Sequence, residues 1–142
     1  MDRFNSNSNT IFKDVALLVV RVFIGFAMLS HGFPKLQMLL DGGKIEFYDF
    51  LGLGPQISLG LTVFAEFACS IFLILGLFTR IALGFLMFTM AFAGFVVHAG
   101  DPFDKREMSL IYLSIFLLLM AFGAGTFSVD YMIEKRKRAS DW

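Results

Sequence analysis

The stretch that decides the fold class is SLGLTVFAEFACSIFLILGLF, residues 58–78. Apart from small hydroxyl and thiol side chains, its one polar residue is Glu66. A helix needs about 20 apolar residues to cross a hydrocarbon core of about 30 Å. This stretch therefore predicts a membrane-spanning helix that carries a carboxyl group inside the bilayer.

Three further stretches have the same character, at residues 15–34, 81–98 and 108–125. The composition agrees, because 57% of the 142 residues are hydrophobic and 19 are phenylalanine. The longest polar segments are the two tails and one loop, so no separate soluble domain is expected. We predict an all-α protein, a transmembrane four-helix bundle surrounded by the lipid bilayer. It forms a single domain over residues 1–142, with a basic tail at residues 131–142.

The basic residues predict the orientation of this bundle. Four spans place both termini on one side of the membrane, and that side carries more cations than the other. Positive residues accumulate on the cytoplasmic side, so the pattern favours N-in/C-in. The first side holds Arg3, Lys13, Arg80 and residues 135–138, and the second holds Lys35, Lys44, Lys105 and Arg106.

Charge and cysteine content exclude several classes of function. The formal net charge is zero, which gives no reason to expect a nucleic-acid partner. Cys69 is the only cysteine, so a dithiol relay to quinone cannot operate within this chain. No set of metal ligands is expected. The first apolar stretch lacks a small-residue cleavage pattern, and we expect it to remain in the mature protein.

Two residues that carry a full charge at neutral pH, Arg21 and Glu66, lie inside the predicted spans, where a charge costs about 2.5–3.5 kcal/mol or more on insertion scales. Arg21 lies about 9 Å from the start of its span. It either snorkels to the lipid head groups or belongs to a binding site. Glu66 is too short to snorkel, so it needs a buried partner or a protonated carboxyl group. Its side chain leans toward the start of its own helix, and we expect it to meet His31 or Lys35, not Arg21.

The ends of the other spans add further polar side chains on the same outer side. His98 closes the third stretch and Glu107 comes just before the fourth. We therefore predict a polar cluster in the outer half of the bundle. The candidate ligand-binding residues are Arg21, His31, Lys35, Glu66, His98 and Glu107, of which Glu66, His31 and His98 are also candidate catalytic residues.

The order and spacing of these residues resemble the DoxX family over nearly the whole chain. The resemblance implies a four-helix protein of the bacterial cytoplasmic membrane. The family name comes from a relative of a quinone-reducing enzyme, and members are often labelled oxidoreductases. The motifs that carry it are Arg21-x9-His31-Gly32-x2-Lys35-Leu36, Ala65-Glu66, LGLFTR at residues 75–80, His98, Glu107 and Gly123-x-Gly125-x2-Ser128-x-Asp130.

The first functional hypothesis is a quinone-linked oxidoreductase, or the membrane subunit of a redox complex. Quinone reduction needs hydrogen-bond donors and a proton source, which His31, Glu66 and His98 are suited to supply. There is no flavin fingerprint and no cysteine set for an iron–sulfur cluster, so electrons would come from a partner or a noncovalent cofactor. Having only two histidines, both near loops, argues against a haem.

Two alternatives remain open. In the first, the polar residues hold the helices together and the protein is a scaffold for membrane or envelope proteins, without catalysis. In the second, Glu66 marks a small carrier or a proton pathway. The lack of an inverted repeat argues against a conventional secondary transporter.

Overall fold

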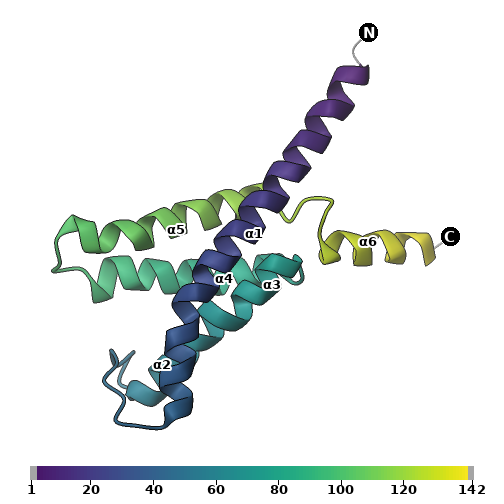
Figure 1. Cartoon of the computed structure of the whole chain (residues 1–142). Helices are drawn as coiled ribbons and strands as arrows, with labels where there is room; N and C mark the ends of the chain where they lie inside the picture. Colours follow the sequence, from purple (N-terminus) through teal and green to yellow (C-terminus); the bar gives the residue numbers. More distant parts are fainter. Residues whose placement is uncertain (1–2, 141–142) are drawn as a thin grey trace.

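The structure is a computed structural model that describes residues 3–140, with side chains described from residue 10 onward. Every regular element in this range is helical, which confirms the all-α prediction (Figure 1). The elements are α1 (Arg3–Asp41), α2 (Pro55–Val63), the π-helical turn η1 (Phe64–Ala68), α3 (Cys69–Leu75), α4 (Thr79–Phe92), the π-helical turn η2 (Ala93–Val97), α5 (Phe103–Phe122) and α6 (Val129–Ser140).

The second and third predicted spans each form one continuous rod with a π turn inside it. The first rod joins α2, η1 and α3 over Pro55–Leu75, and the second joins α4 and η2 over Thr79–Val97. Both are long and apolar enough to cross a membrane. A π turn shifts hydrogen bonds from i−4 to i−5 and is often found at functional sites. One of these turns carries Glu66, and the other ends just before His98.

Helix α1 is longer than the apolar stretch that it contains. It has 39 residues and passes through Pro34, where the predicted span at residues 15–34 ends. A proline removes one backbone hydrogen bond from a helix interior. The helix continues because its last turns pack against α2 and η1. It ends at Asp41, and Gly42 takes a positive φ of 63° that begins the connection to α2.

The helices meet at one end of the molecule and separate at the other. Helix α1 pairs with the α2–η1–α3 rod, while α4 pairs with α5. Figure 1 shows these two hairpins diverging toward their connecting loops. All four rods contribute to one apolar core, which contains Ile24, Met28, Cys69, Leu73, Leu83, Leu86, Phe116 and Leu119.

An aromatic cluster ties the long connection after α1 to the second hairpin. The ring of Phe50 lies 4.8 Å from that of Phe92 and 6.0 Å from that of Phe88, measured between centroids. Tyr48 also packs on Phe92, at 5.8 Å. Edge-on pairs of this kind add about 0.5–1.5 kcal/mol each beyond area burial. The connection is therefore held against α4.

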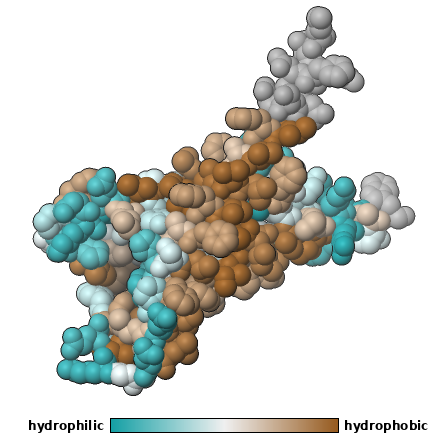
Figure 2. Space-filling view, viewed as in Figure 1, coloured by the Kyte–Doolittle hydropathy of each residue, from teal (hydrophilic) through white to brown (hydrophobic). Residues whose placement is uncertain are grey.

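The outer surface suits a lipid environment. Figure 2 shows hydrophobic residues over the middle of the molecule, with hydrophilic residues at the loop ends of both hairpins and along α6. Large apolar side chains such as Phe23 and Phe88 are 71% and 59% exposed. Exposed apolar area on this scale marks a membrane or interaction surface.

Candidate functional site

Glu66 is paired with Lys35 in the interface between α1 and η1. The Glu66 residue is 3% exposed, and the Lys35 ammonium nitrogen lies 2.6 Å from Oε1 and 2.5 Å from Oε2. The Lys35 side chain itself is 30% exposed, so it extends from the buried carboxylate to the surface. The prediction that Glu66 meets His31 or Lys35, and not Arg21, is confirmed, because its partner is Lys35.

The backbone of α1 approaches η1 closely enough to make this pair. A Cβ atom added to Gly32 would lie 2.8 Å from the carbonyl carbon of Glu66 and 2.9 Å from its oxygen. Only glycine permits this approach. The Ser70 hydroxyl donates a 2.6 Å hydrogen bond to the Glu66 carbonyl oxygen. Lys35 follows Gly32 by one helical turn, which brings its stem to the Glu66 carboxylate.

His31 lies beside a tyrosine that is not among the predicted site residues. Its ring meets Tyr112 of α5 edge-on, with centroids 5.7 Å apart and an interplanar angle of 89°. Tyr112 also packs on Phe116, with ring centroids 6.0 Å apart. Tyr112 is the only tyrosine within the four predicted spans, and this signal could have identified it. We call Lys35, Glu66, His31 and Tyr112 the outer polar group.

His98 has a different partner, at the loop end of the α4–α5 hairpin. Its Nδ1 lies 2.7 Å from Oδ2 of Asp101, and this hydrogen bond lowers the pKa of the Asp101 carboxyl below its ordinary value. Nearby, Arg106 Nε donates a 3.0 Å hydrogen bond to the Gly94 carbonyl in η2. This bond satisfies a carbonyl group within the π turn.

The predicted cluster is therefore not assembled as one group. Among residues 10–140, no ion pair or hydrogen bond joins His31, His98 or Glu107 to the Lys35–Glu66 pair, and His31 is linked instead to Tyr112 by a ring contact. Glu107 is exposed near the start of α5. The physical reason is the divergence of the two hairpins, which separates residues that sit at similar depths along their helices (Figure 1).

The His98–Asp101 contact predicts a pH effect. Replacing His98 by alanine removes the hydrogen bond to the Asp101 carboxylate, so the pKa of Asp101 should rise toward its ordinary value. Because the pKa of Asp101 is lower in the folded protein than in the unfolded chain, the hydrogen bond stabilises the fold at pH values above the unfolded-state pKa. This stabilisation is lost as the pH falls through the lower, folded-state pKa of Asp101. A carboxyl-carbon NMR titration measures the change, with His31→Ala as control. An unchanged Asp101 titration in His98→Ala would contradict the assignment.

Arg21 occupies a second polar site, near the end of the molecule that bears α6. It is 1% exposed and so does not snorkel. Its Nη1 donates to the Ala124 carbonyl, and its Nη2 donates to the Phe127 carbonyl at 2.7 Å. A Cβ atom on Gly76, whose φ is +69°, would lie 2.7 Å from Nη1. The guanidinium group thus satisfies carbonyls of the irregular segment after α5 and packs against the turn after α3.

The same segment is joined to α4 through Asp130. The Asp130 carboxylate accepts hydrogen bonds from the backbone N–H groups of Phe78 and Thr79, both at 2.8 Å. Its own N–H donates to the Gly76 carbonyl at 2.9 Å. A carboxylate at a helix N-terminus satisfies free N–H groups and complements the helix dipole. We call Arg21, Gly76, Asp130 and the two carbonyls bonded by Arg21 the Arg21 junction.

These two polar sites differ in what they can do chemically. In the Arg21 junction, the guanidinium group is buried, and its two terminal nitrogens are bonded to partly buried carbonyl groups of the chain itself. In the outer polar group, Lys35, His31 and Tyr112 combine donor groups with partial or full exposure. Within the part of the chain that the structure describes, no three His, Cys, Asp or Glu side chains gather as metal ligands. The outer polar group is suited to an organic ligand with polar oxygens.

Comparison with known proteins places both sites in context. The family model of DoxX matches residues 16–99, a range that includes Arg21, the outer polar group apart from Tyr112, and His98. An uncharacterised protein of Haemophilus influenzae is 29% identical over 135 residues, which cover 88% of this chain and 96% of that protein. No solved structure matches the chain.

Two Escherichia coli proteins are also similar. The inner membrane protein YphA is 28% identical over 128 residues, covering 83% of this chain and 90% of that protein. The inner membrane protein YqjF is 25% identical over 130 residues, covering 87% and 96%. These matches extend through most of each protein, so the resemblance is not limited to one segment.

Proposed function

The chain belongs to the DoxX family and is a bacterial inner membrane protein, and from this premise we propose that it is the membrane subunit of a redox system. Its outer polar group binds the head group of a membrane quinone. A partner redox protein supplies two electrons, and the site conducts two protons to the quinone oxygens, giving the quinol. The chain itself carries out the binding and the proton delivery.

The observation that carries the proposal is the incomplete use of Lys35. An ammonium group has three N–H donors, and the two oxygens of Glu66 account for two of them. The third donor and the partly exposed stem can serve a ligand carbonyl at the surface. Glu66 gives the Lys35 ammonium group the oppositely charged partner that a cation needs in an apolar setting.

His31 and Tyr112 supply the other donors that the proposal needs. Both carry a ring N–H or O–H group, and they come from α1 and α5, so the site lies where two helices meet. A quinone has two carbonyl oxygens and an apolar ring, which suit paired donors beside aromatic side chains. Histidine changes its charge near neutral pH and can pass a proton to a reduced oxygen.

The membrane topology that belongs to this proposal has four spans in the N-in/C-in orientation. Its support is the core shared by four rods, the exposed apolar belt and the basic residues of α6. The outer polar group then lies in the periplasmic half of the bilayer. A reporter fused after residue 142 should be active only in the cytoplasm, and periplasmic activity would overturn the orientation.

The redox proposal is tested by extracting quinone from the protein purified in mild detergent. We expect bound quinone in the unmodified protein and its loss in Lys35→Met. Lys44→Met is the matched control, because that side chain is 89% exposed and lies on the loop after α1. Absence of quinone from the unmodified protein, or equal amounts in both variants, would contradict the proposal.

A second candidate function is a scaffold for other membrane or envelope proteins. It is favoured by the extent to which charges are satisfied within the chain, since both Glu66 oxygens are bonded to Lys35 and Arg21 is bonded to two loop carbonyls. Under this function, Lys35→Met would release a co-purifying protein, while no quinone would be found in any sample. A pull-down from membranes, combined with the extraction, separates the two functions.

A further inference from the structure

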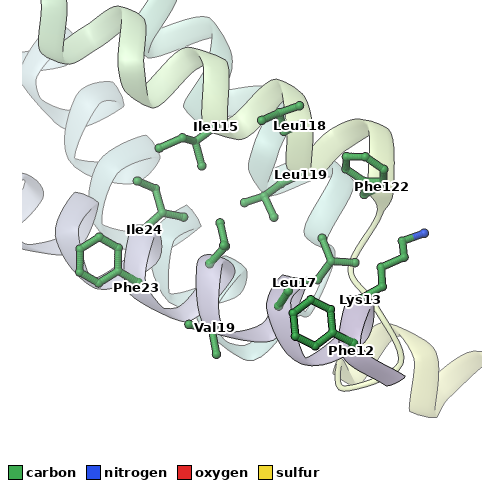
Figure 3. A pocket seen from close by; sticks show the side chains of 12 residues that line it. Phe12, Lys13, Leu17, Val19, Phe23, Ile24, Ile115, Leu118, Leu119 and Phe122 are labelled. Atoms are coloured by element: carbon green, nitrogen blue, oxygen red, sulfur yellow. The ribbon is translucent and has the colours of Figure 1, made fainter. Parts of the chain in front are cut away.

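A long apolar groove runs between α1 and α5, on the α6 side of the outer polar group. It has a volume of about 700 Å³, within the range of about 300–1,000 Å³ that ligand pockets occupy. Figure 3 shows side chains from the two helices facing each other across it, with Lys13 at one end. We propose that this α1–α5 groove binds one acyl chain of an anionic phospholipid, whose head group is held by Lys13.

The position of Lys13 is the first argument for a negatively charged occupant. Its ammonium nitrogen lies 5.3 Å from the ring centroid of Phe122, which holds the cation at the groove end. Within residues 10–140, no acidic side chain forms an ion pair with Lys13. The neighbouring carboxylate of Asp14 faces elsewhere, where it accepts a 2.7 Å hydrogen bond from Thr126.

The length of the groove is the second argument. Along α1 its lining extends from Phe12 to Ile24, which corresponds to about 18 Å of helix. One leaflet accounts for about half of a hydrocarbon core of about 30 Å. The groove therefore matches one acyl chain of one leaflet, with the cation at the depth of the head group. Beyond its far end, the contact between His31 and Tyr112 brings α1 and α5 together.

The lining gives the third argument, because it offers nothing polar except Lys13. The remaining side chains are aliphatic or aromatic, and several are strongly exposed, such as Phe23 at 71% and Leu118 at 58%. A neutral isoprenoid tail would make no use of the cation, and neither would an apolar helix from a second copy. An anionic amphiphile uses both the cation and the apolar wall. This inference does not depend on the quinone proposal.

The experiment measures contact between a tryptophan in the groove and brominated acyl chains, which quench its fluorescence. The sole tryptophan of the chain, Trp142, is replaced by phenylalanine, and Phe23→Trp places a reporter in the groove. The full chain is reconstituted in phosphatidylcholine vesicles that contain an equal small fraction of brominated phosphatidylglycerol or brominated phosphatidylcholine. A control reporter, Phe85→Trp, is 47% exposed on α4, outside the groove and more than one helical turn from Arg80.

We expect the Phe23→Trp reporter to favour the anionic lipid by about fivefold, the equivalent of about 1 kcal/mol for one basic side chain near the membrane surface. Lys13→Gln should abolish this preference. Lys137→Gln, which removes a cation from α6, should leave it unchanged. The Phe85→Trp reporter should respond equally to both lipids.

Several results would overturn the proposal. Equal quenching of the Phe23→Trp reporter by the two lipids would show that the groove does not select the head group. If Lys137→Gln lost the preference for the anionic lipid as fully as Lys13→Gln, the preference would come from the overall surface charge and not from Lys13. Displacement of the brominated lipid by added ubiquinone would identify a quinone tail as the occupant. Weak quenching together with a cross-linked dimer would identify a second copy. Where Phe23→Trp lacks the helical circular dichroism of the parent, Val19→Trp serves as the reporter.

Discussion

Lys35→Met should destabilise the protein far more than Glu66→Leu, although the two substitutions break the same ion pair. Removing Lys35 leaves a carboxylate that is 3% exposed without a partner, and breaking a buried pair in this way costs about 3–5 kcal/mol. Because the Lys35 side chain is 30% exposed, we expect a loss at or below the lower end of that range. Removing Glu66 leaves a lysine that can extend to the surface.

The double variant Lys35→Met/Glu66→Leu makes this prediction specific. It removes both charges and leaves an apolar contact, so it should regain most of the stability that Lys35→Met loses. Thermal unfolding in detergent, followed by circular dichroism, measures all four members of the cycle. Equal losses in the two single variants, or a double variant less stable than either, would contradict the description of the pair.

The second large effect is expected at the Arg21 junction. Arg21→Met leaves the carbonyls of Ala124 and Phe127 without donors. A fully buried unsatisfied group costs about 1–3 kcal/mol, and because these carbonyls are partly buried we expect a loss at the lower end of that range for each. The segment between α5 and α6 should then detach from the turn after α3. We expect a lower unfolding temperature and faster limited proteolysis within residues 123–128. Arg80→Met, at an exposed position beside the same turn, is the matched control.

Gly76→Ala tests the same junction from the opposite side. The added methyl group would lie 2.7 Å from the Arg21 guanidinium, and φ at this position is +69°. It should therefore reproduce the proteolysis pattern of Arg21→Met without removing a charge. A Gly76→Ala protein as resistant as the parent would mean that the guanidinium can move away at little cost. In that case the contacts of the Arg21 guanidinium would contribute less to stability than we expect.

Much of the fold could be predicted from apolar stretches and helical rise. The depth of Glu66 along its helix, combined with the tilt of helical side chains toward the N-terminus, predicts that its carboxylate lies at the level of Lys35. The structure contains this ion pair. Depth along a helix says nothing about how far two hairpins separate. This is why His98 and Glu107 were expected beside Glu66, whereas His98 binds Asp101 and Glu107 is exposed.

Other features depend on contacts that no local pattern reveals. Arg21 near a helix end suggested snorkelling, because that interpretation assumes a lipid-facing side chain. Its burial depends on carbonyls more than a hundred positions away in the chain. The family motifs at residues 75–80 and 123–130 lie far apart in the sequence, and only the structure shows that Asp130 caps α4 at Thr79. Tyr112 was missed because a lone tyrosine in an apolar stretch resembles a packing residue.

The π turn at Phe64–Ala68 changes the direction in which the side chains after it point around the helix axis. Such a turn is equivalent to one surplus residue, so deleting a single position there would rotate everything beyond it by about 100°. Glu66 would lose either its alignment with Lys35 or the core contacts of Cys69 and Leu73. Because of this extra residue, one helix can direct Glu66 toward Lys35 and also direct Cys69 and Leu73 into the apolar core.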